Sequence, residues 1–368
     1  MSSTATHATT SELFEPLRLG AITLPNRVVM APLTRTRAEQ GGVPGALMAE
    51  YYTQRAGFGL VVTEGTYPSH ESQAYVGQPG IANNAQAQGW QKVAESVHRN
   101  GGRIVMQLMH GGRTAHPNIN GGRRVLGPSP LAAEGEAFTE KGREGYLIPQ
   151  EMSLEDIDAV IAEFAASARR AIDVGLDGVE VHAANGYLLH QFLAPGSNQR
   201  ADEYGGGPEN RARFVVEVVE AVAAAVGAER VGVRVSPEHN IQGATETDHA
   251  DVLATYSSVL DHIRPLGLAY LSVVHADPLG DTVQTLREQF GKPLLVNTGF
   301  ASQTTYHDAT RLIQSPLVDA VVVGRAAIAN PDLVERWSAG HAENTPRPEL
   351  FYAFTPEGYT DYPVIERG

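Results

Sequence analysis

Short apolar runs recur along the whole chain, separated by loops and by stretches with helical periodicity. The runs are four to six residues long and rich in Val, Ile or Leu, and most of them do not alternate strictly with polar residues. This pattern is typical of strands that are buried on both faces of a parallel sheet. The predicted strands are 27–30, 60–63, 103–108, 178–182, 231–236, 269–274, 293–297 and 320–324.

Amphipathic helical patterns lie between these runs. The pattern over 154–174 begins after Ser153, a good N-cap, has Asp156 at the position of a near capping box, and ends at Gly175. Further helices are predicted over 86–99, 208–226, 248–263, 302–313 and 331–337.

Alternating strands and helices predict a parallel sheet with right-handed crossovers. Eight such units fit a single closed (β/α)8 TIM barrel, which takes roughly 250 residues plus insertions. The alternative, an open doubly wound sheet, would need a glycine-rich turn after its first strand, and residues 30–34 do not provide one. We expect a disordered tail over 1–12 and one domain over 13–368.

Two segments are longer than ordinary loops. Residues 112–151, after the third strand, are dense in Gly, Pro and charge, and we expect a lid insertion there. The segment after Gly340 is rich in aromatic residues, so we expect it to pack against the barrel. These aromatic residues are Phe351, Tyr352, Phe354, Tyr359 and Tyr362.

Composition narrows the possible functions. The chain has no cysteine, which excludes disulfides, thiolate metal sites, iron–sulfur clusters and Cys nucleophiles. The formal net charge of −14 disfavours nucleic acid and anionic membrane surfaces as partners. With neither a signal peptide nor a long apolar segment in the sequence, we expect a cytoplasmic protein acting on small molecules without an obligate protein partner.

In a barrel, chemistry is placed at the carboxyl ends of the strands. Gly299 and Gly324 follow the seventh and eighth strands, where barrels commonly bind phosphate through backbone N–H groups, and Arg325 adds a guanidinium fork. The alternative is that both glycines only shape turns and that Arg325 is a surface charge.

The fourth strand ends in His182, followed by Asn185 and Tyr187. His and Asn can polarise one carbonyl or nitro oxygen together, and a tyrosine can deliver a proton. Each residue could instead have only a structural role. A zinc site that pairs His182 with His190 or His110 is disfavoured, because carboxylate ligands at matching strand ends are missing.

Three more polar residues suit the pyrimidine end of a flavin. Gln107 offers a donor and an acceptor to the flavin amide, and the cation of Arg234 favours negative charge near N1 on reduction. Thr34 could bond to the flavin O4. Each could also be a buried polar group satisfied within the barrel.

Together these motifs resemble the Old Yellow Enzyme family of FMN-dependent ene-reductases over nearly the whole chain, and the bacterial nitroester and N-ethylmaleimide reductase branch in particular. Thr34, where a sister branch has Cys, is shared with the plant, yeast and nitroester-reducing bacterial enzymes. The motifs that carry the resemblance are 13–16, 26–34, 107–113, 182–193, 200–205, 324–325, 330–332 and 357–362.

The resemblance implies noncovalent FMN, reduced by NADPH or NADH, that passes hydride from N5 to an α,β-unsaturated carbonyl or nitroalkene. Nitrate esters are a further substrate class. His182 and Asn185 would hold the activating oxygen and Tyr187 would protonate the α-carbon. The implied FMN contacts are Pro32, Thr34, Gly65, Gln107, Arg234, Gly299, Phe300, Gly324 and Arg325, and the implied substrate contacts are His182, Asn185, Tyr75, Met109 and Tyr352.

Two positions depart from many relatives. Met109 stands where a bulky Trp is common, and Asn185 where some bacterial relatives have a second His. Both changes affect the expected substrate pocket. Two other functions stay open: a phosphate-site barrel hydrolase or lyase, which would need a base or lysine that we do not find at a strand end, and a flavin- or phosphate-binding protein without turnover.

Overall fold

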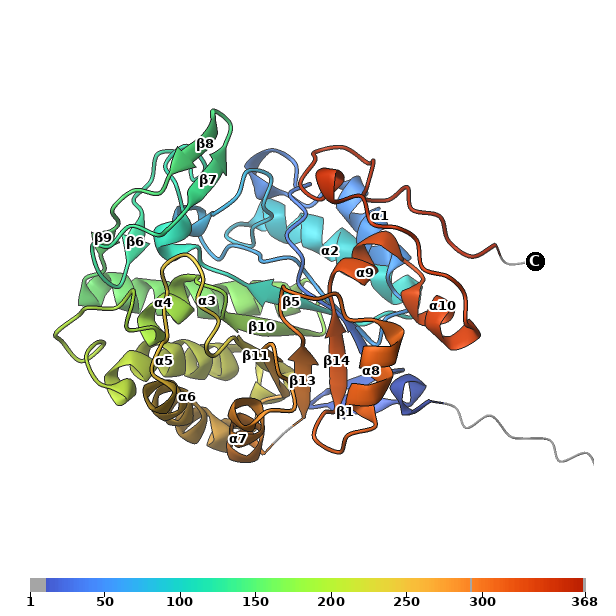
Figure 1. The fold of residues 1–368 in the computed structure, drawn as a ribbon. Coiled ribbons are helices and arrows are strands. Elements are labelled where there is room, and N and C mark those ends of the chain that lie inside the picture. The colour runs from blue at the N-terminus through green and yellow to red at the C-terminus, as the bar shows by residue number, and fades with distance from the viewer. Residues whose placement is uncertain (1–10, 292, 367–368) are drawn as a thin grey trace, which may run out of the picture.

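The computed structural model describes residues 11–291 and 293–366. Eight parallel strands form a closed barrel in the order β10-β11-β12-β13-β14-β3-β4-β5, with helices around it (Figure 1). Every predicted strand is confirmed, with no end displaced by more than one residue. The strands are β3 (Val28–Met30), β4 (Leu60–Val62), β5 (Ile104–Leu108), β10 (Gly178–Ala183), β11 (Val231–Val235), β12 (Tyr270–Val274), β13 (Leu294–Asn297) and β14 (Ala320–Val323).

The predicted burial of both strand faces is also found. Every residue of β5, β10, β11 and β12 is buried, because one face meets the barrel interior and the other meets the surrounding helices. Pairing of β14 with β3 closes the barrel, with Val321 opposite Val28 and Val323 opposite Met30.

Six helices correspond to the predicted patterns. They are α2 (Asn84–Arg99), α3 (Leu154–Asp173), α5 (Pro208–Val226), α6 (His249–Ile263), α8 (Tyr306–Ile313) and α10 (Leu333–Ala339). Ser153 and Asp156 form a full capping box at α3. The predicted start of α8 at residue 302 is wrong, because Thr305 and Asp308 form a capping box that begins the helix at Tyr306.

Four helices were not predicted. They are α1 (Ala46–Gln54), α4 (Leu188–Leu193), α7 (Asp281–Phe290) and α9 (Arg325–Ala329). All six residues of α4 are buried, so this helix has no polar face from which a helical period could be recognised.

A hairpin that the strand pattern did not predict covers the amino-terminal end of the barrel. Its strands are β1 (Leu17–Leu19) and β2 (Ile22–Leu24), which pair antiparallel. Leu19 and Leu24 pack in one cluster with Val29, Leu60 and Leu295 of the barrel strands. Of the predicted tail, residues 1–10 lie outside the described residues, and Glu12 begins a 3-10 helix.

The insertion over 112–151 contains two small sheets at the carboxyl end of the barrel. β6 (Leu126–Gly127) pairs with β9 (Gln150–Glu151), and β7 (Glu136–Thr139) forms a hairpin with β8 (Gly142–Gly145) that projects at the top of Figure 1. Arg113 ties the insertion to the loop after β11, because its guanidinium donates to the carbonyl oxygens of Leu131 and Gln242.

The C-terminal segment packs beside this mouth. Arg35 donates to the carbonyl oxygens of Phe351 and Gly358, and Tyr359 stacks on Tyr51 with ring centroids 4.0 Å apart. Arg37 donates to the Phe351 carbonyl as well. These bonds hold Phe351 and its neighbours at the rim of the barrel mouth.

No helix among residues 11–291 and 293–366 combines the length and the apolar character that crossing a membrane requires.

Candidate active site

A cavity of about 480 Å³ opens at the carboxyl ends of the strands. Its volume lies within the roughly 300–1,000 Å³ usual for small-molecule sites. The structure brings fourteen of the fifteen predicted site residues to its wall: Pro32, Thr34, Tyr75, Gln107, Met109, His182, Asn185, Tyr187, Arg234, Gly299, Phe300, Gly324, Arg325 and Tyr352.

Gly65 is the predicted residue that does not line the cavity. A Cβ placed on Gly65 would lie 2.5 Å from Sδ of Met109, so the glycine leaves room for the methionine, which lines the cavity. The predicted contact of Gly65 with FMN stays a prediction.

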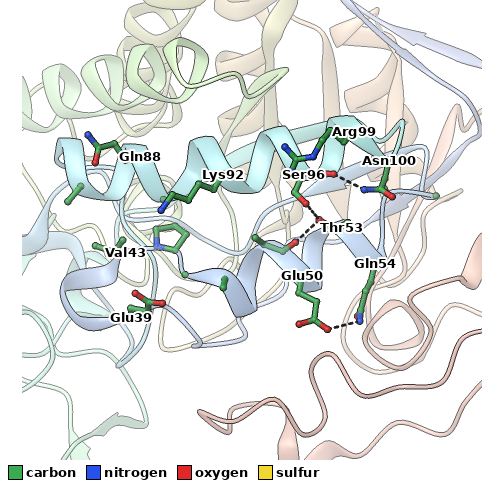
Figure 2. Close-up of a pocket in the computed structure, with 18 residues that line it drawn as sticks. Glu39, Val43, Glu50, Thr53, Gln54, Gln88, Lys92, Ser96, Arg99 and Asn100 are labelled. Carbon is green, nitrogen blue, oxygen red and sulfur yellow. Dashed lines mark hydrogen bonds between the residues drawn. The ribbon is translucent and has the colours of Figure 1, made fainter.

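A larger hollow, of about 1160 Å³, lies on the outside of the barrel between α1 and α2 (Figure 2). Several of its polar side chains bond to one another: the hydroxyl of Thr53 donates to Oγ of Ser96 at 2.7 Å, and the amide of Asn100 donates to the Ser96 carbonyl at 2.9 Å. It lies away from the carboxyl ends of the strands, where a barrel carries its chemistry. We therefore assign the functional site to the smaller cavity.

The turn after β10 places the residues of the proposed oxygen clamp. Asn185 has φ +58° and Gly186 has φ +78°, and this left-handed pair turns the chain from β10 into α4. The N–H of Asn185 donates to Oγ of Ser236 at 2.8 Å, and that of Gly186 donates to Nδ1 of His190 at 2.8 Å. The turn is thus held on both sides by side chains.

Two polar atoms of this clamp are buried without a partner: Nδ1 of His182 and Oδ1 of Asn185. Buried polar atoms are normally hydrogen-bonded, so such orphans at a cavity wall indicate a place for a ligand. Burial lowers the pKa of His182 well below its usual value, and the charges of Arg234 and His190 lower it further. The imidazole is therefore neutral at neutral pH and can donate a hydrogen bond without acting as an acid.

Tyr187 forms the next part of the wall. Its hydroxyl shares a short hydrogen bond with that of Tyr75, and its ring lies 5.2 Å from the ring of His182. Burial raises the pKa of Tyr187, although the hydrogen bond with Tyr75 lowers it in part. The phenol is therefore protonated at neutral pH, as a proton donor must be.

The zinc alternative finds no support in this geometry. His190 uses its Nδ1 to accept the Gly186 N–H, and its Nε2 faces Oε1 of Glu246 at 3.4 Å. Within the described part of the chain, no group of three or more His, Cys, Asp or Glu residues is arranged to hold a metal ion.

The cavity floor carries Gln107 and Arg234, both buried. The amide of Gln107 donates to Oε1 of Glu180 at 2.8 Å. Burial lowers the pKa of Arg234, whereas Glu180 and Tyr270 raise it, and its Nε is buried without a partner. Glu180 was not predicted, because it lies inside an apolar strand run and not at its end.

The opposite end of the cavity suits an anionic tail. Gly299 has φ +82°, and Cβ atoms placed on Gly299 and Gly324 would meet no atom closer than 3.9 and 3.8 Å, so a ligand can approach the backbone there. Arg325 is exposed and donates to the Phe300 carbonyl at 2.9 Å. The ring of Phe300 packs 5.0 Å from that of His239.

These features fit FMN. The open backbone at Gly299 and Gly324 can take a phosphate beside Arg325, and the unpartnered Nε of Arg234 lies at the floor, where a flavin pyrimidine would need a donor. Further lining residues were not among the predicted contacts. They include Leu33, Ile241, Gln242, Asn297, Gln303, Thr304, Ile328 and Phe351.

The barrel and this donor set define a flavin-dependent oxidoreductase. Comparison with known proteins agrees: the model of the NADH:flavin oxidoreductase / NADH oxidase family matches residues 12–344, and the chain belongs to this family, which includes the Old Yellow Enzymes. The predicted family, enzyme class and cofactor are confirmed, so the chain is an FMN-dependent oxidoreductase that uses a nicotinamide hydride donor.

Several known proteins are similar over almost their full length. A probable flavin mononucleotide-dependent alkene reductase of Leishmania infantum is 40% identical, with 96% of this chain and 97% of the relative covered. Morphinone reductase in complex with tetrahydroNAD is 41% identical, with a TM-score of 0.90. The match covers 96% of this chain and 98% of morphinone reductase. The Old Yellow Enzyme homologue from Zymomonas mobilis is 37% identical, with a TM-score of 0.90. The match covers 96% of this chain and 99% of the homologue. These similarities favour the flavoenzyme over the hydrolase or lyase.

Proposed function

We propose that the chain is an ene-reductase that reduces the activated C=C bond of α,β-unsaturated carbonyls and nitroalkenes, with nitrate esters as a further substrate class. The observation that carries this proposal is the grouping of His182, Asn185 and Tyr187 in one cavity, where Nδ1 of His182 has no partner and the Tyr187 phenol is protonated. When bound, FMN would supply the hydride chemistry that links NADPH or NADH to the β-carbon of the alkene.

The chain's own residues hold the cofactor from two ends. Gln107 and Arg234 would bind the flavin pyrimidine from the cavity floor, and Thr34 would bind its O4. Gly299 and Gly324 would let their backbone reach the phosphate, beside Arg325 and Phe300. Pro32 lines the wall between these two ends.

His182 and Asn185 would bind the activating oxygen of the substrate. A neutral imidazole and an amide donate hydrogen bonds without transferring a proton, so they stabilise the negative charge that develops on this oxygen. Tyr187 would then deliver its hydroxyl proton to the α-carbon, and Tyr75 holds that hydroxyl through the bond between the two phenols.

Substrate shape would be set by Met109 and the aromatic rim. Met109 is buried against Gly65, and its thioether can adapt its shape to different ligands. Tyr352 is 64% exposed at the mouth, where a large substrate would cover it.

The test is a two-step anaerobic titration of the purified protein. The oxidised protein should show flavin absorbance, NADPH or NADH should bleach it, and 2-cyclohexenone should restore it. Bleaching that no activated alkene reverses would overturn the proposed reaction and indicate a flavin-binding protein without this turnover. Absence of flavin, with activity on a phosphorylated metabolite restored by divalent metal, would support the hydrolase alternative.

A further inference from the structure

A carboxylate that the proposed reaction does not use lies directly beneath the cavity floor. Glu180 is on β10, two residues before His182, so both side chains point into the barrel and Glu180 lies one layer deeper. It is only 1% exposed. Burying a carboxylate this deeply costs folding free energy unless its oxygens accept hydrogen bonds. Glu180 therefore needs hydrogen-bond partners.

Both carboxylate oxygens of Glu180 accept a hydrogen bond, one from the adjacent strand β5 and the other from β12, two strands away. The Gln107 amide on β5 donates to Oε1 at 2.8 Å, and the Tyr270 hydroxyl on β12 donates to Oε2 at 3.1 Å. The two donors come from opposite sides of β10 in the barrel order. The carboxylate therefore connects three strands beneath the site.

The barrel leaves space for this arrangement at Gly232. In the strand register, Gly232 lies between Glu180 on one side and Tyr270 on the other. A Cβ placed on Gly232 would lie 2.2 Å from Cζ of the Tyr270 ring, so the ring crosses the position that a side chain would occupy. The missing side chain lets the Tyr270 hydroxyl reach Glu180.

Glu180 constrains the orientation of Gln107. An ionised carboxylate accepts hydrogen bonds and donates none, so the Gln107 amide must present its NH2 group to Glu180. Its carbonyl oxygen then stays available as an acceptor at the cavity floor, as the N–H of a flavin pyrimidine would require.

Glu180 also acts on Arg234 through its charge. Each group stabilises the charged form of the other: the carboxylate raises the pKa of Arg234, and the guanidinium lowers that of Glu180, in both cases against the effect of burial. The two residues lie on adjacent strands, because Gly232, opposite Glu180 in the register, is two residues before Arg234. Removing the carboxylate therefore leaves the buried guanidinium without this opposing charge.

We propose that Glu180 is a positioning residue that orients Gln107 and offsets the charge of Arg234, and thereby sets the reduction potential of the bound flavin. This inference rests on the proposed placement of Gln107 and Arg234 against the flavin pyrimidine. Arg234 would stabilise the negative charge of the reduced flavin near N1, and the carboxylate would moderate that effect.

The test is the flavin midpoint potential of Glu180→Gln, measured by spectrophotometric titration against a reference dye. The substitution keeps the shape of the side chain and removes its charge, so the flavin becomes easier to reduce. At a fixed solution potential, the ratio of reduced to oxidised flavin should rise about tenfold. For a two-electron couple this ratio corresponds to a rise in midpoint potential of ~30 mV. Reduction by NADPH should become faster, and reoxidation by 2-cyclohexenone slower.

Glu217→Gln is the matched control. Glu217 also accepts a tyrosine hydroxyl, that of Tyr204 at 3.0 Å, but it lies on α5 outside the barrel. This variant should keep the wild-type potential. Glu180→Asp retains the negative charge, so its midpoint potential should stay closer to that of the wild type. Its shorter side chain no longer reaches Gln107, so this variant should bind FMN more weakly.

Tyr270→Phe keeps the inference testable if Glu180→Gln does not fold or hold FMN. It removes one donor and makes Glu180 harder to ionise, so the reduced fraction should rise in the same direction by a smaller factor. If Glu180→Gln has the wild-type midpoint potential, the inference is overturned and the proposed function stays intact. If Glu180→Gln cannot be measured, a wild-type midpoint potential in Tyr270→Phe has the same consequence. A wild-type protein that binds no FMN overturns the proposed function itself.

Discussion

The hydroxyl groups of Tyr75 and Tyr187 meet in a short hydrogen bond at the wall of the cavity, although the residues are 112 positions apart in the chain. Tyr187 stands at the N-cap of α4, and Tyr75 lies in the loop after β4. The bond holds the Tyr187 phenol in place at the cavity wall.

Tyr187→Phe should separate the two half-reactions. Reduction of the flavin by NADPH should stay close to the wild-type rate, because no proton from Tyr187 enters that step. Reduction of 2-cyclohexenone should slow by roughly 10²-fold or more, the usual contribution of a positioned proton donor. Anaerobic stopped-flow absorbance of each half-reaction measures both rates.

Tyr75→Phe is the matched variant, since it removes the partner hydroxyl and keeps the donor. It should slow alkene reduction by less than Tyr187→Phe does. Equal losses in both half-reactions of Tyr187→Phe would show that its role is structural.

His182→Ala should weaken the binding of para-substituted phenols, whose oxygen would occupy the clamp. The loss of one neutral donor predicts a rise in dissociation constant of about tenfold. Titration of the oxidised protein, followed by the change in flavin absorbance, gives the constant. His249→Ala, on an exposed residue bonded to Glu238, should leave it unchanged, and unaltered affinity in His182→Ala would contradict the clamp.

Gly65→Ala should disturb the pocket through Met109. The new methyl group would lie 2.5 Å from Sδ of Met109, so the thioether must move, and the cavity is the open side. KM for bulky substituted cyclohexenones should rise by about tenfold relative to unsubstituted cyclohexenone.

Adding Met109→Ala to Gly65→Ala should restore that KM ratio, because the displaced side chain is then absent. A double variant as impaired as Gly65→Ala alone would mean that Gly65 acts on the ligand by another route.

His110 should make the protein less stable in acid. Burial lowers the pKa of His110 to about 3, whereas an unfolded histidine titrates near ~6.5. Between these two pKa values the histidine is protonated in the unfolded chain and neutral in the folded chain. The free energy of unfolding therefore decreases as the pH falls from the unfolded pKa toward the folded one. At pH 4 the loss amounts to about 3 kcal/mol.

Urea unfolding from pH 7 to 4 measures this effect. His110→Asn should lose stability less steeply with falling pH than the wild type does. His307→Asn, on an exposed residue of α8, should follow the wild type. Identical slopes for His110→Asn and the wild type would rule out the assignment.

The strands and most of the cavity wall could be predicted because their signals are local. Runs such as 104–108 and 178–183 are mostly apolar since both faces are buried, and a barrel places the residues at the end of each run at one mouth. His182 and Arg234 could therefore be assigned to one site from their positions at strand ends alone.

Glu180 shows where this reasoning stops. Its position inside an apolar run gives no sign of function, and its partners Gln107 and Tyr270 become visible only when the strand neighbours and the gap at Gly232 are known. The contact of Gly65 with Met109 is similar, because it depends on side-chain packing after the chain has folded.

The crystal structure of the FMN complex with a para-substituted phenol tests the central claim most directly. We predict the flavin pyrimidine against Gln107 and Arg234, the phosphate beside Gly324 and Arg325, and the phenol oxygen within hydrogen-bonding distance of His182 and Asn185. FMN bound elsewhere, or a phenol oxygen facing away from His182 and Asn185, would contradict the account.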